Sequence, residues 1–175
     1  GLAVTVNYAT SNGTATAGAD YTAISSTQLT IAAGATTATF NVAVLADSLD
    51  EANETATLTL SSASNASISD ATGTLTITDD DSTPSLAIND VSGNETAGNR
   101  EFTVTLSAAA GRDVTVAYAT SNGTATAGAD YTATSGTLTI SAGDTTATFT
   151  VAVLADSLDE ANETATLTLS SASNA

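Results

Sequence analysis

Cysteine, histidine, lysine, methionine and tryptophan are all absent from this 175-residue sequence, and proline occurs once, at Pro84. Without cysteine the chain has no disulfides, no thiol chemistry and no ligands for soft metals. Without histidine it lacks the side chain that most often acts as a general base in enzymes. No apolar run is long enough to span a bilayer. Aromatic residues are few, so a core has to be built mainly from valine, leucine and isoleucine.

Positive charge is also scarce, because 19 acidic residues stand against two bases, Arg100 and Arg112. A net charge of -17 opposes binding to nucleic-acid phosphates and to anionic membranes, so we expect no nucleic-acid partner and no membrane insertion. It favours either metal cations or a strongly solvated surface. Most of the acids fall in loops at matching places of a repeat, which favours the metal alternative.

The repeat has a period of about 110 residues, the size of an immunoglobulin-like sandwich. Residues 4–23 match residues 114–133 at all positions but one, and residues 29–66 match residues 138–175 at all but three. We expect two partial copies: residues 1–81, which lack the opening strands of the unit, and residues 82–175, which lack its closing strand. With no signal peptide and no initiator methionine, we expect the chain to be a processed or excised piece of a longer array.

Alternating apolar residues predict β-strands, and no segment has a helical period. Phe102, Val104 and Leu106, for example, alternate with threonines. In the second copy we expect strands near residues 85–89, 101–107, 114–118, 138–140, 147–153 and 165–169, with a turn or bulge at 93–98. Residues 75–77 supply the closing strand of the first copy. The predicted fold is all-β: an immunoglobulin-like antiparallel Greek-key β-sandwich of about seven strands.

Acidic residues occur at four kinds of position, each in a predicted loop or at the end of a predicted strand. They are a Gly-Ala-Asp-Tyr corner, an Asp-Ser-Leu-Asp-Glu-Ala-Asn-Glu loop, a terminal triplet of aspartates and an early glutamate. Loops of such a sandwich cluster at its two ends, so these acids can converge. Close carboxylates repel by roughly 1 kcal/mol or more per pair near a surface, so gathering them calls for a counter-ion. Oxygen ligands that are many and loop-borne favour Ca²⁺ over Mg²⁺.

The corner, the acidic loop and the aspartate triplet together resemble the Calx-beta domain, a calcium-binding module of sodium–calcium exchangers that is also common in large bacterial surface proteins. The resemblance covers essentially the whole chain. It implies calcium ligands at Asp20, Asp47, Glu51, Glu54, Asp79, Asp80, Asp81, Glu95, Asp130, Asp156, Glu160 and Glu163, and a carbonyl ligand at Leu49 or Leu158. Exchanger domains begin the loop with two adjacent aspartates, whereas Ala46 and Ala155 stand here, which implies fewer ions.

Several acids have a simpler interpretation. Asp50 and Asp159 match no ligand of the family, and we expect them on a solvated surface. Tyr21 and Tyr131 are expected to be packing rings at the corner rather than ligand contacts. The acidic cluster could also belong to a degenerate module that keeps its acids without binding metal. Paired carboxylates occur in glycosidases, but a sandwich edge of small residues offers no deep pocket, so we expect no enzyme.

Two functions remain open from the sequence. The favoured one is a calcium-binding tandem module of an extracellular or cell-surface bacterial protein, such as an adhesin or stalk, in which calcium stiffens the loops and the junction between neighbouring modules. The alternative is a passive spacer or fibre subunit, with open strand edges completed by strands from another chain.

Overall fold

The computed structural model describes residues 1–175, apart from the side chain of Ala97. The chain divides into two compact units, the first formed by Gly1–Ser48 and Ala52–Asp80, the second by Leu49–Glu51 and Asp81–Ala175. Each is described by itself below. Among the described residues, no helix has the length and apolar character that crossing a membrane would require.

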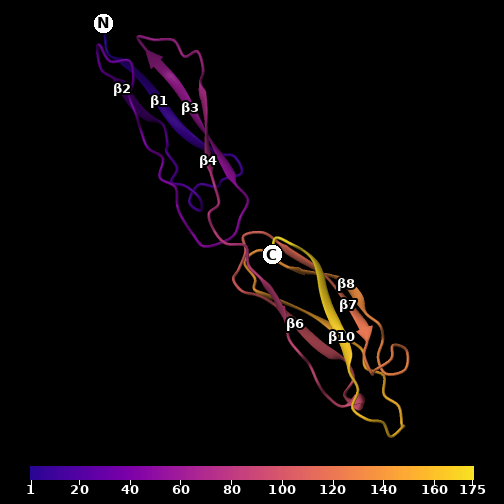
Figure 1. Ribbon diagram of the computed structural model, residues 1–175. Coiled ribbons are helices and arrows are strands. Elements are labelled where there is room, and N and C mark those ends of the chain that lie inside the picture. The colour runs from indigo at the N-terminus through magenta and orange to yellow at the C-terminus, as the bar shows by residue number, and fades with distance from the viewer. The chain divides into compact units, whose positions relative to one another are not determined.

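The first unit is one antiparallel sheet of four strands in the order β2-β1-β3-β4 (Figure 1). Its strands are β1 (Val4–Asn12), β2 (Thr27–Ile31), β3 (Glu54–Ser64) and β4 (Thr72–Ile77). Val4 lies opposite Ile31 in the β1–β2 ladder, and Tyr8 lies opposite Leu60 in the β1–β3 ladder. Because side chains alternate along a strand, these registers bring the apolar residues of neighbouring strands onto one face.

The second unit is a sandwich of two antiparallel sheets, ordered β10-β7-β8 and β5-β6-β9 (Figure 1). Its elements are β5 (Leu86–Ile88), the 3-10 helix η1 (Glu95–Ala97), β6 (Arg100–Leu106), β7 (Val114–Asn122), β8 (Ser135–Ile140), β9 (Thr146–Val151) and β10 (Ala165–Ser173). Chain order alternates between the sheets after β6, β8 and β9. The predicted fold class, an immunoglobulin-like antiparallel β-sandwich, is confirmed.

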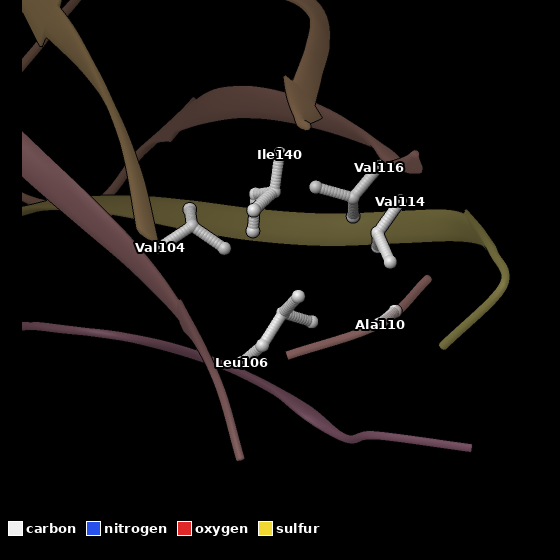
Figure 2. Packing of buried hydrophobic residues seen from close by; sticks show 6 residues of the cluster. All are labelled: Val104, Leu106, Ala110, Val114, Val116 and Ile140. Atoms are coloured by element: carbon white, nitrogen blue, oxygen red, sulfur yellow. The ribbon is translucent and has the colours of Figure 1, made fainter. Parts of the chain in front are cut away.

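A cluster of branched aliphatic residues fills the space between the two sheets. Val104 and Leu106 of β6 face Val114 of β7 and Ile140 of β8 (Figure 2), and all four side chains are buried. The alternation with threonine along β6 produces this contact, because every second residue points toward the other sheet. Burial of a valine or isoleucine side chain contributes about 1.5–3 kcal/mol, so this sparse core depends on each of its members.

One pair of matching segments differs in structure between the units. Thr146–Val151 forms β9, which pairs with β6 through registers such as Phe102 opposite Phe149. The matching residues 37–42 of the first unit belong to no strand. A strand requires a hydrogen-bonded neighbour, and the described sheet of the first unit offers none in the position of β6.

Each unit has a tyrosine at a corner of the chain, Tyr21 after β1 and Tyr131 after β7. Tyr21 and Tyr131 are 0% and 4% exposed, which confirms the prediction that they are packing rings. Their hydroxyls donate to Asn12 Oδ1 and Asn122 Oδ1, both at 2.8 Å. The same asparagine oxygens accept backbone N–H groups at 2.9 Å. The corner that carries the predicted ligands Asp20 and Asp130 is therefore tied to the strand before it.

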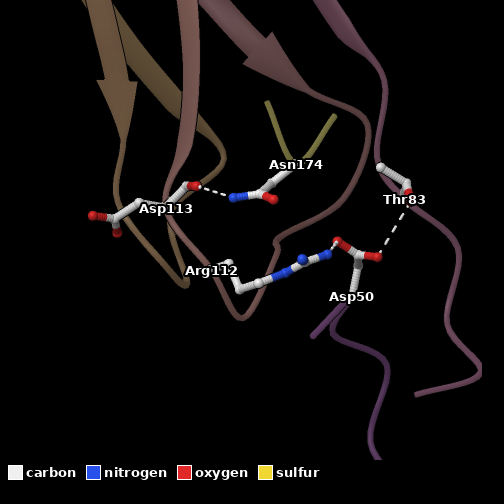
Figure 3. A network of polar contacts seen from close by, with 5 residues as sticks. All are labelled: Asp50, Thr83, Arg112, Asp113 and Asn174. Carbon is white, nitrogen blue, oxygen red and sulfur yellow. Dashed lines mark hydrogen bonds and ion pairs between the residues drawn. The ribbon is translucent and has the colours of Figure 1, made fainter. Parts of the chain in front are cut away.

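The prediction that Asp50 lies on a solvated surface is wrong. Its side chain is buried within the second unit, 4% exposed, and accepts a hydrogen bond at 2.6 Å from Arg112 Nη2 (Figure 3). Thr83 Oγ1 donates to the other carboxylate oxygen at 3.3 Å, and the backbone N–H of Gly111 donates to the Asp50 carbonyl at 3.1 Å. Its counterpart Asp159 is exposed, as expected.

The sequence offers one signal for the burial of an aspartate such as Asp50, namely the presence of Arg112. A chain with two bases and 19 acids will pair a half-buried guanidinium with a carboxylate, because an unpaired charge removed from water is costly. Near Arg112, the Asn174 side-chain amide donates to the Asp113 carbonyl at 2.8 Å, which fastens the residue after β10 to the start of β7 (Figure 3).

Trimming one methyl group from the buried core should destabilise the second unit more than the same change in the first. We expect Ile140→Val to lower the free energy of unfolding of the second unit by about 1 kcal/mol, because Ile140 is fully buried. The matched control Ile31→Val removes the same methyl from a half-buried site and should cost the first unit less. Denaturant unfolding followed by NMR signals of each unit measures both losses; equal losses would contradict this account.

Removing the partner of Asp50 should also weaken the second unit. We expect Arg112→Ala to lower its free energy of unfolding by about 1–3 kcal/mol, a range reduced because Arg112 is itself 36% exposed. The double variant Asp50→Ala with Arg112→Ala leaves no buried charge and should be more stable than Arg112→Ala alone. Chemical denaturation compares the three proteins; a double variant less stable than the single one would refute the pairing argument.

Candidate metal centre

Five carboxylates from three segments meet at one end of the second unit. Glu95 comes from η1, Asp130 from the corner after β7, and Asp156, Glu160 and Glu163 from the loop between β9 and β10. Oxygens of Glu95, Asp156 and Glu160 lie within 4.8 Å of one another, and so do oxygens of Asp130, Glu160 and Glu163. Glu160 belongs to both groups and therefore links them into one cluster, called the acidic pole below.

Backbone hydrogen bonds hold the two aspartates of the acidic pole. Asp130 Oδ2 accepts the N–H of Thr126 at 2.6 Å, while the Asp130 carbonyl accepts the N–H of Leu154 at 2.9 Å. The second bond fastens the corner to the residue just before the acidic loop. Asp156 Oδ1 accepts the N–H of Leu158 at 2.6 Å, which is the local turn that aspartate favours.

The far end of the acidic loop is fastened as well. The N–H of Thr164 donates to Thr124 Oγ1 at 2.8 Å, and the Thr164 carbonyl accepts the N–H of Ala125 at 3.0 Å. Thr164 directly follows Glu163, so these bonds place Glu163 beside the corner that carries Asp130. Both ends of the loop are thus attached to the same corner, which explains why acids 26 to 33 residues from Asp130 return to it.

Mutual repulsion and desolvation perturb two of the five carboxylates. The charge of Asp156 is the largest cause that raises the pKa of Glu160, followed by desolvation and by the charges of Asp130 and Glu95. Desolvation is the largest cause that raises the pKa of Glu163, followed by the charge of Asp130, a hydrogen bond with Asp130 and the charge of Glu160. The acids of the pole therefore favour an added positive charge, whether a proton or a cation.

The donor set fits a calcium ion. Ca²⁺ takes six to eight oxygens at about 2.3–2.6 Å, so oxygens around one ion lie up to about 5 Å apart, which spans the 4.8 Å groups of the pole. Five carboxylates can supply that number through bidentate contacts, with water completing the shell. Zinc prefers histidine nitrogen and cysteine sulphur as ligands, and this chain contains neither histidine nor cysteine.

The first unit holds two of the predicted ligands close together. Asp20 and Asp47 each offer an oxygen within 4.8 Å of the other's. Asp20 Oδ2 accepts the N–H of Thr16 at 2.6 Å, and its carbonyl accepts the N–H of Leu45 at 2.9 Å. These bonds repeat those of Asp130, as the near-identity of the two copies requires.

The remaining predicted ligands are placed as follows. Glu54 is the first residue of β3, and Asp79 donates its backbone N–H to Asn53 Oδ1 at 3.0 Å within the first unit. Among the described residues, Glu54, Asp79 and Asp80 join no group of three carboxylates. Glu51 and Asp81 belong to the second unit, where the Glu51 side chain lies against Gly111. Leu158 is 65% exposed, and its role as a carbonyl ligand, like that of Leu49, stays a prediction.

The geometry defines a class of protein: an antiparallel β-sandwich with a cluster of carboxylates at one end. The family model of the Calx-beta domain matches residues 1–81 and again residues 79–175, so the chain belongs to the Calx-beta family as a tandem of two such domains. The resemblance predicted from the sequence is therefore confirmed. Among curated proteins, none matches the chain in sequence.

Several solved structures are similar to the chain. The crystal structure of CBD12 from CALX1.2 is 25% identical with a TM-score of 0.47, and the match covers 98% of this chain and 68% of that one. The calcium binding domain CBD12 of CALX1.1 is 24% identical with a TM-score of 0.45, covering 98% and 69%. The Calx CBD2 domain is 25% identical with a TM-score of 0.47, covering 50% and 55%.

The raised pKa values of Glu160 and Glu163 predict an unusual pH dependence in the absence of calcium. Their folded-state pKa values lie above the ordinary value of 4.5, so the folded state binds more protons than the unfolded state between 4.5 and the raised values. Stability must then fall as the pH rises through this window. We expect the melting temperature of the second unit, measured in chelator, to increase as the pH is lowered from neutral toward the ordinary value of 4.5.

The control for this titration is the double variant Glu160→Gln with Glu163→Gln. It removes both perturbed groups and should flatten the pH dependence of the melting temperature across the window. A wild-type melting temperature that decreases on acidification, or a slope that survives in the variant, would contradict the assignment of the effect to these two glutamates.

Proposed function

We propose that this chain is a tandem calcium-binding module and that the acidic pole of the second unit, Glu95, Asp130, Asp156, Glu160 and Glu163, holds the ion. The observation that carries the proposal is the sharing of Glu160 between two groups of carboxylates whose oxygens lie within 4.8 Å of one another. Bound Ca²⁺ would neutralise charges that otherwise repel, and would hold η1, the corner and the β9–β10 loop together.

The first unit carries the matching residues Asp20 and Asp47, and we propose that they form part of an equivalent site. Membership of the Calx-beta family, together with the matching corner and loop acids, supports the same chemistry here. The number of ions that each unit takes follows from the titration described below, because each occupied site adds one equivalent of calcium.

We further propose that the module works outside the cell, as part of a bacterial surface protein such as a stalk or adhesin. Extracellular calcium modules bind with dissociation constants of about 10⁻⁴ to 10⁻³ M, which suits sites built from exposed loops. At millimolar calcium, such a site adds about 0.4–1.4 kcal/mol of stability per ion. That increment matters for a unit whose core is small and whose net charge favours expansion.

Calorimetric titration of the full chain with calcium tests the proposed site. We expect binding in the 10⁻⁴ to 10⁻³ M range and a higher melting temperature of the second unit at millimolar calcium than in chelator. Glu160→Gln should weaken calcium binding at the second unit at least about tenfold, because the shared ligand is lost to both groups. The matched control Asp159→Asn removes one charge from the same loop, at an exposed residue outside both groups, and should change the affinity far less.

Failure of the wild-type chain to bind calcium or to gain thermal stability at millimolar concentrations would refute the proposal. The chain would then be a structural spacer whose acids keep it soluble. Equal weakening by Glu160→Gln and Asp159→Asn would show that general charge, rather than the acidic pole, attracts the ion.

A further inference from the structure

Arg100 is the first residue of β6 and directly follows the turn that carries Glu95, one acid of the acidic pole. In the β6–β9 ladder Arg100 lies opposite Val151, the last residue of β9. The chain has two bases, and the other, Arg112, is paired with Asp50. Among the described residues Arg100 forms no ion pair with a carboxylate, so its hydrogen bonds go elsewhere.

The guanidinium of Arg100 holds the turn by two backbone carbonyls. Nη1 donates to the carbonyl of Gly98 at 3.1 Å, and Nη2 donates to the carbonyl of Asn94. These two acceptors flank η1, Glu95–Ala97, on its two sides. A guanidinium carries its N–H donors in a rigid planar fork, so a single side chain can fix both ends of the turn at once.

The turn itself contributes little to its own stability. The 3-10 helix η1 is three residues long, and hydrogen-bond geometry in such helices is poorer than in an α-helix. Among the described residues, Asn94 makes no capping hydrogen bond with its side chain. The bonds from Arg100 therefore connect an intrinsically weak turn to the end of a sheet.

Gly93 allows the guanidinium to lie against the turn. A Cβ atom on Gly93 would lie 2.8 Å from both Cζ and Nη2 of Arg100, which is closer than such atoms approach one another in proteins. Because the guanidinium is the end of a flexible side chain, an added methyl group at this position would displace it rather than the backbone. Gly93 and Arg100 therefore depend on each other.

We propose that Arg100 is a positioning residue for the calcium site. By fixing the turn to β6, it keeps the Glu95 carboxylate within 4.8 Å of oxygens of Asp156 and Glu160, one of the two groups of the acidic pole. The strand opposite Arg100, β9, leads into the loop that carries these two acids, so Arg100 joins both segments where the sheet ends. This inference rests on the proposed binding of calcium.

The direction of the effect separates positioning from charge. Arg100 is a cation in the same unit as the site and repels Ca²⁺, so its removal would strengthen calcium binding if charge alone mattered. Positioning has the opposite sign, because a released turn no longer holds Glu95 beside the other ligands. Loss of a residue that orients a metal ligand typically weakens metal binding about 10–100-fold.

Calcium titration of the full chain, followed by amide NMR signals of the loop between β9 and β10, tests the proposal. We expect Arg100→Ala to weaken calcium binding at the second unit about tenfold, although it makes the chain more negative. Gly93→Ala should also weaken binding, with no change of charge, because the methyl group displaces the guanidinium. The matched control Asn99→Ala, at the exposed neighbour of Arg100, should leave the affinity unchanged.

A double-variant cycle shows whether Arg100 acts through Glu95. When Glu95→Gln has already weakened the ligand, addition of Arg100→Ala should cause no further loss of affinity. In chelator, Arg100→Ala should lower the melting temperature of the second unit less than Arg112→Ala does. The reason is that Arg100 holds an exposed turn, whereas Arg112 is the partner of a buried carboxylate.

Unchanged or tighter binding by Arg100→Ala, in a wild-type background that binds calcium, would refute the positioning role and leave the proposed function intact. Additive losses in the cycle with Glu95→Gln would have the same consequence, because Arg100 would then act on the whole unit. Absence of calcium binding by the wild-type chain would refute both this inference and the proposed function.

Discussion

The contact between β6 and the sheet that contains β7 and β8 is the interaction on which the rest of the structure depends. It buries a few branched aliphatic side chains in a chain whose apolar content is largely alanine and whose net charge is -17. Once Val104 and Leu106 have set one sheet over the other, the loops at the ends of the strands are brought to common positions. The first unit shows the converse: its sheet forms, but residues 37–42 form no strand, and a groove lies over the side of the sheet that carries Val4 and Ile31.

The acidic pole follows from this arrangement rather than from any local motif. Glu95 precedes β6, Asp130 follows β7, and Asp156, Glu160 and Glu163 lie between β9 and β10, so the three segments approach one another only when both sheets are in place. The hydrogen bonds from Leu154 and Thr164 to the corner then fix the loop at both ends. The raised pKa values of Glu160 and Glu163 are the electrostatic consequence, and they connect the fold to the proposed binding of a cation.

Identical sequence does not give identical chemistry in the two copies of the acidic loop. Asp50 and Asp159 occupy equivalent positions in the same nine-residue sequence, yet Asp50 is buried against Arg112 while Asp159 is exposed. A carboxylate serves as an ion-pair partner or as a candidate metal ligand according to what the surrounding fold places beside it.

The sequence by itself determined the secondary structure type, the repeat, the corner tyrosines and the family, because alternation, period and local turn chemistry are properties of neighbouring residues. It also identified all five acids of the pole as candidates, since their residue types and positions match a known pattern. Tertiary structure alone decided which acids meet, that Asp50 pairs with Arg112, and that residues 37–42 form no strand although their counterparts form β9. The physical reason is that charge repulsion, burial and strand pairing depend on distances between segments far apart in the chain, which local pattern does not contain.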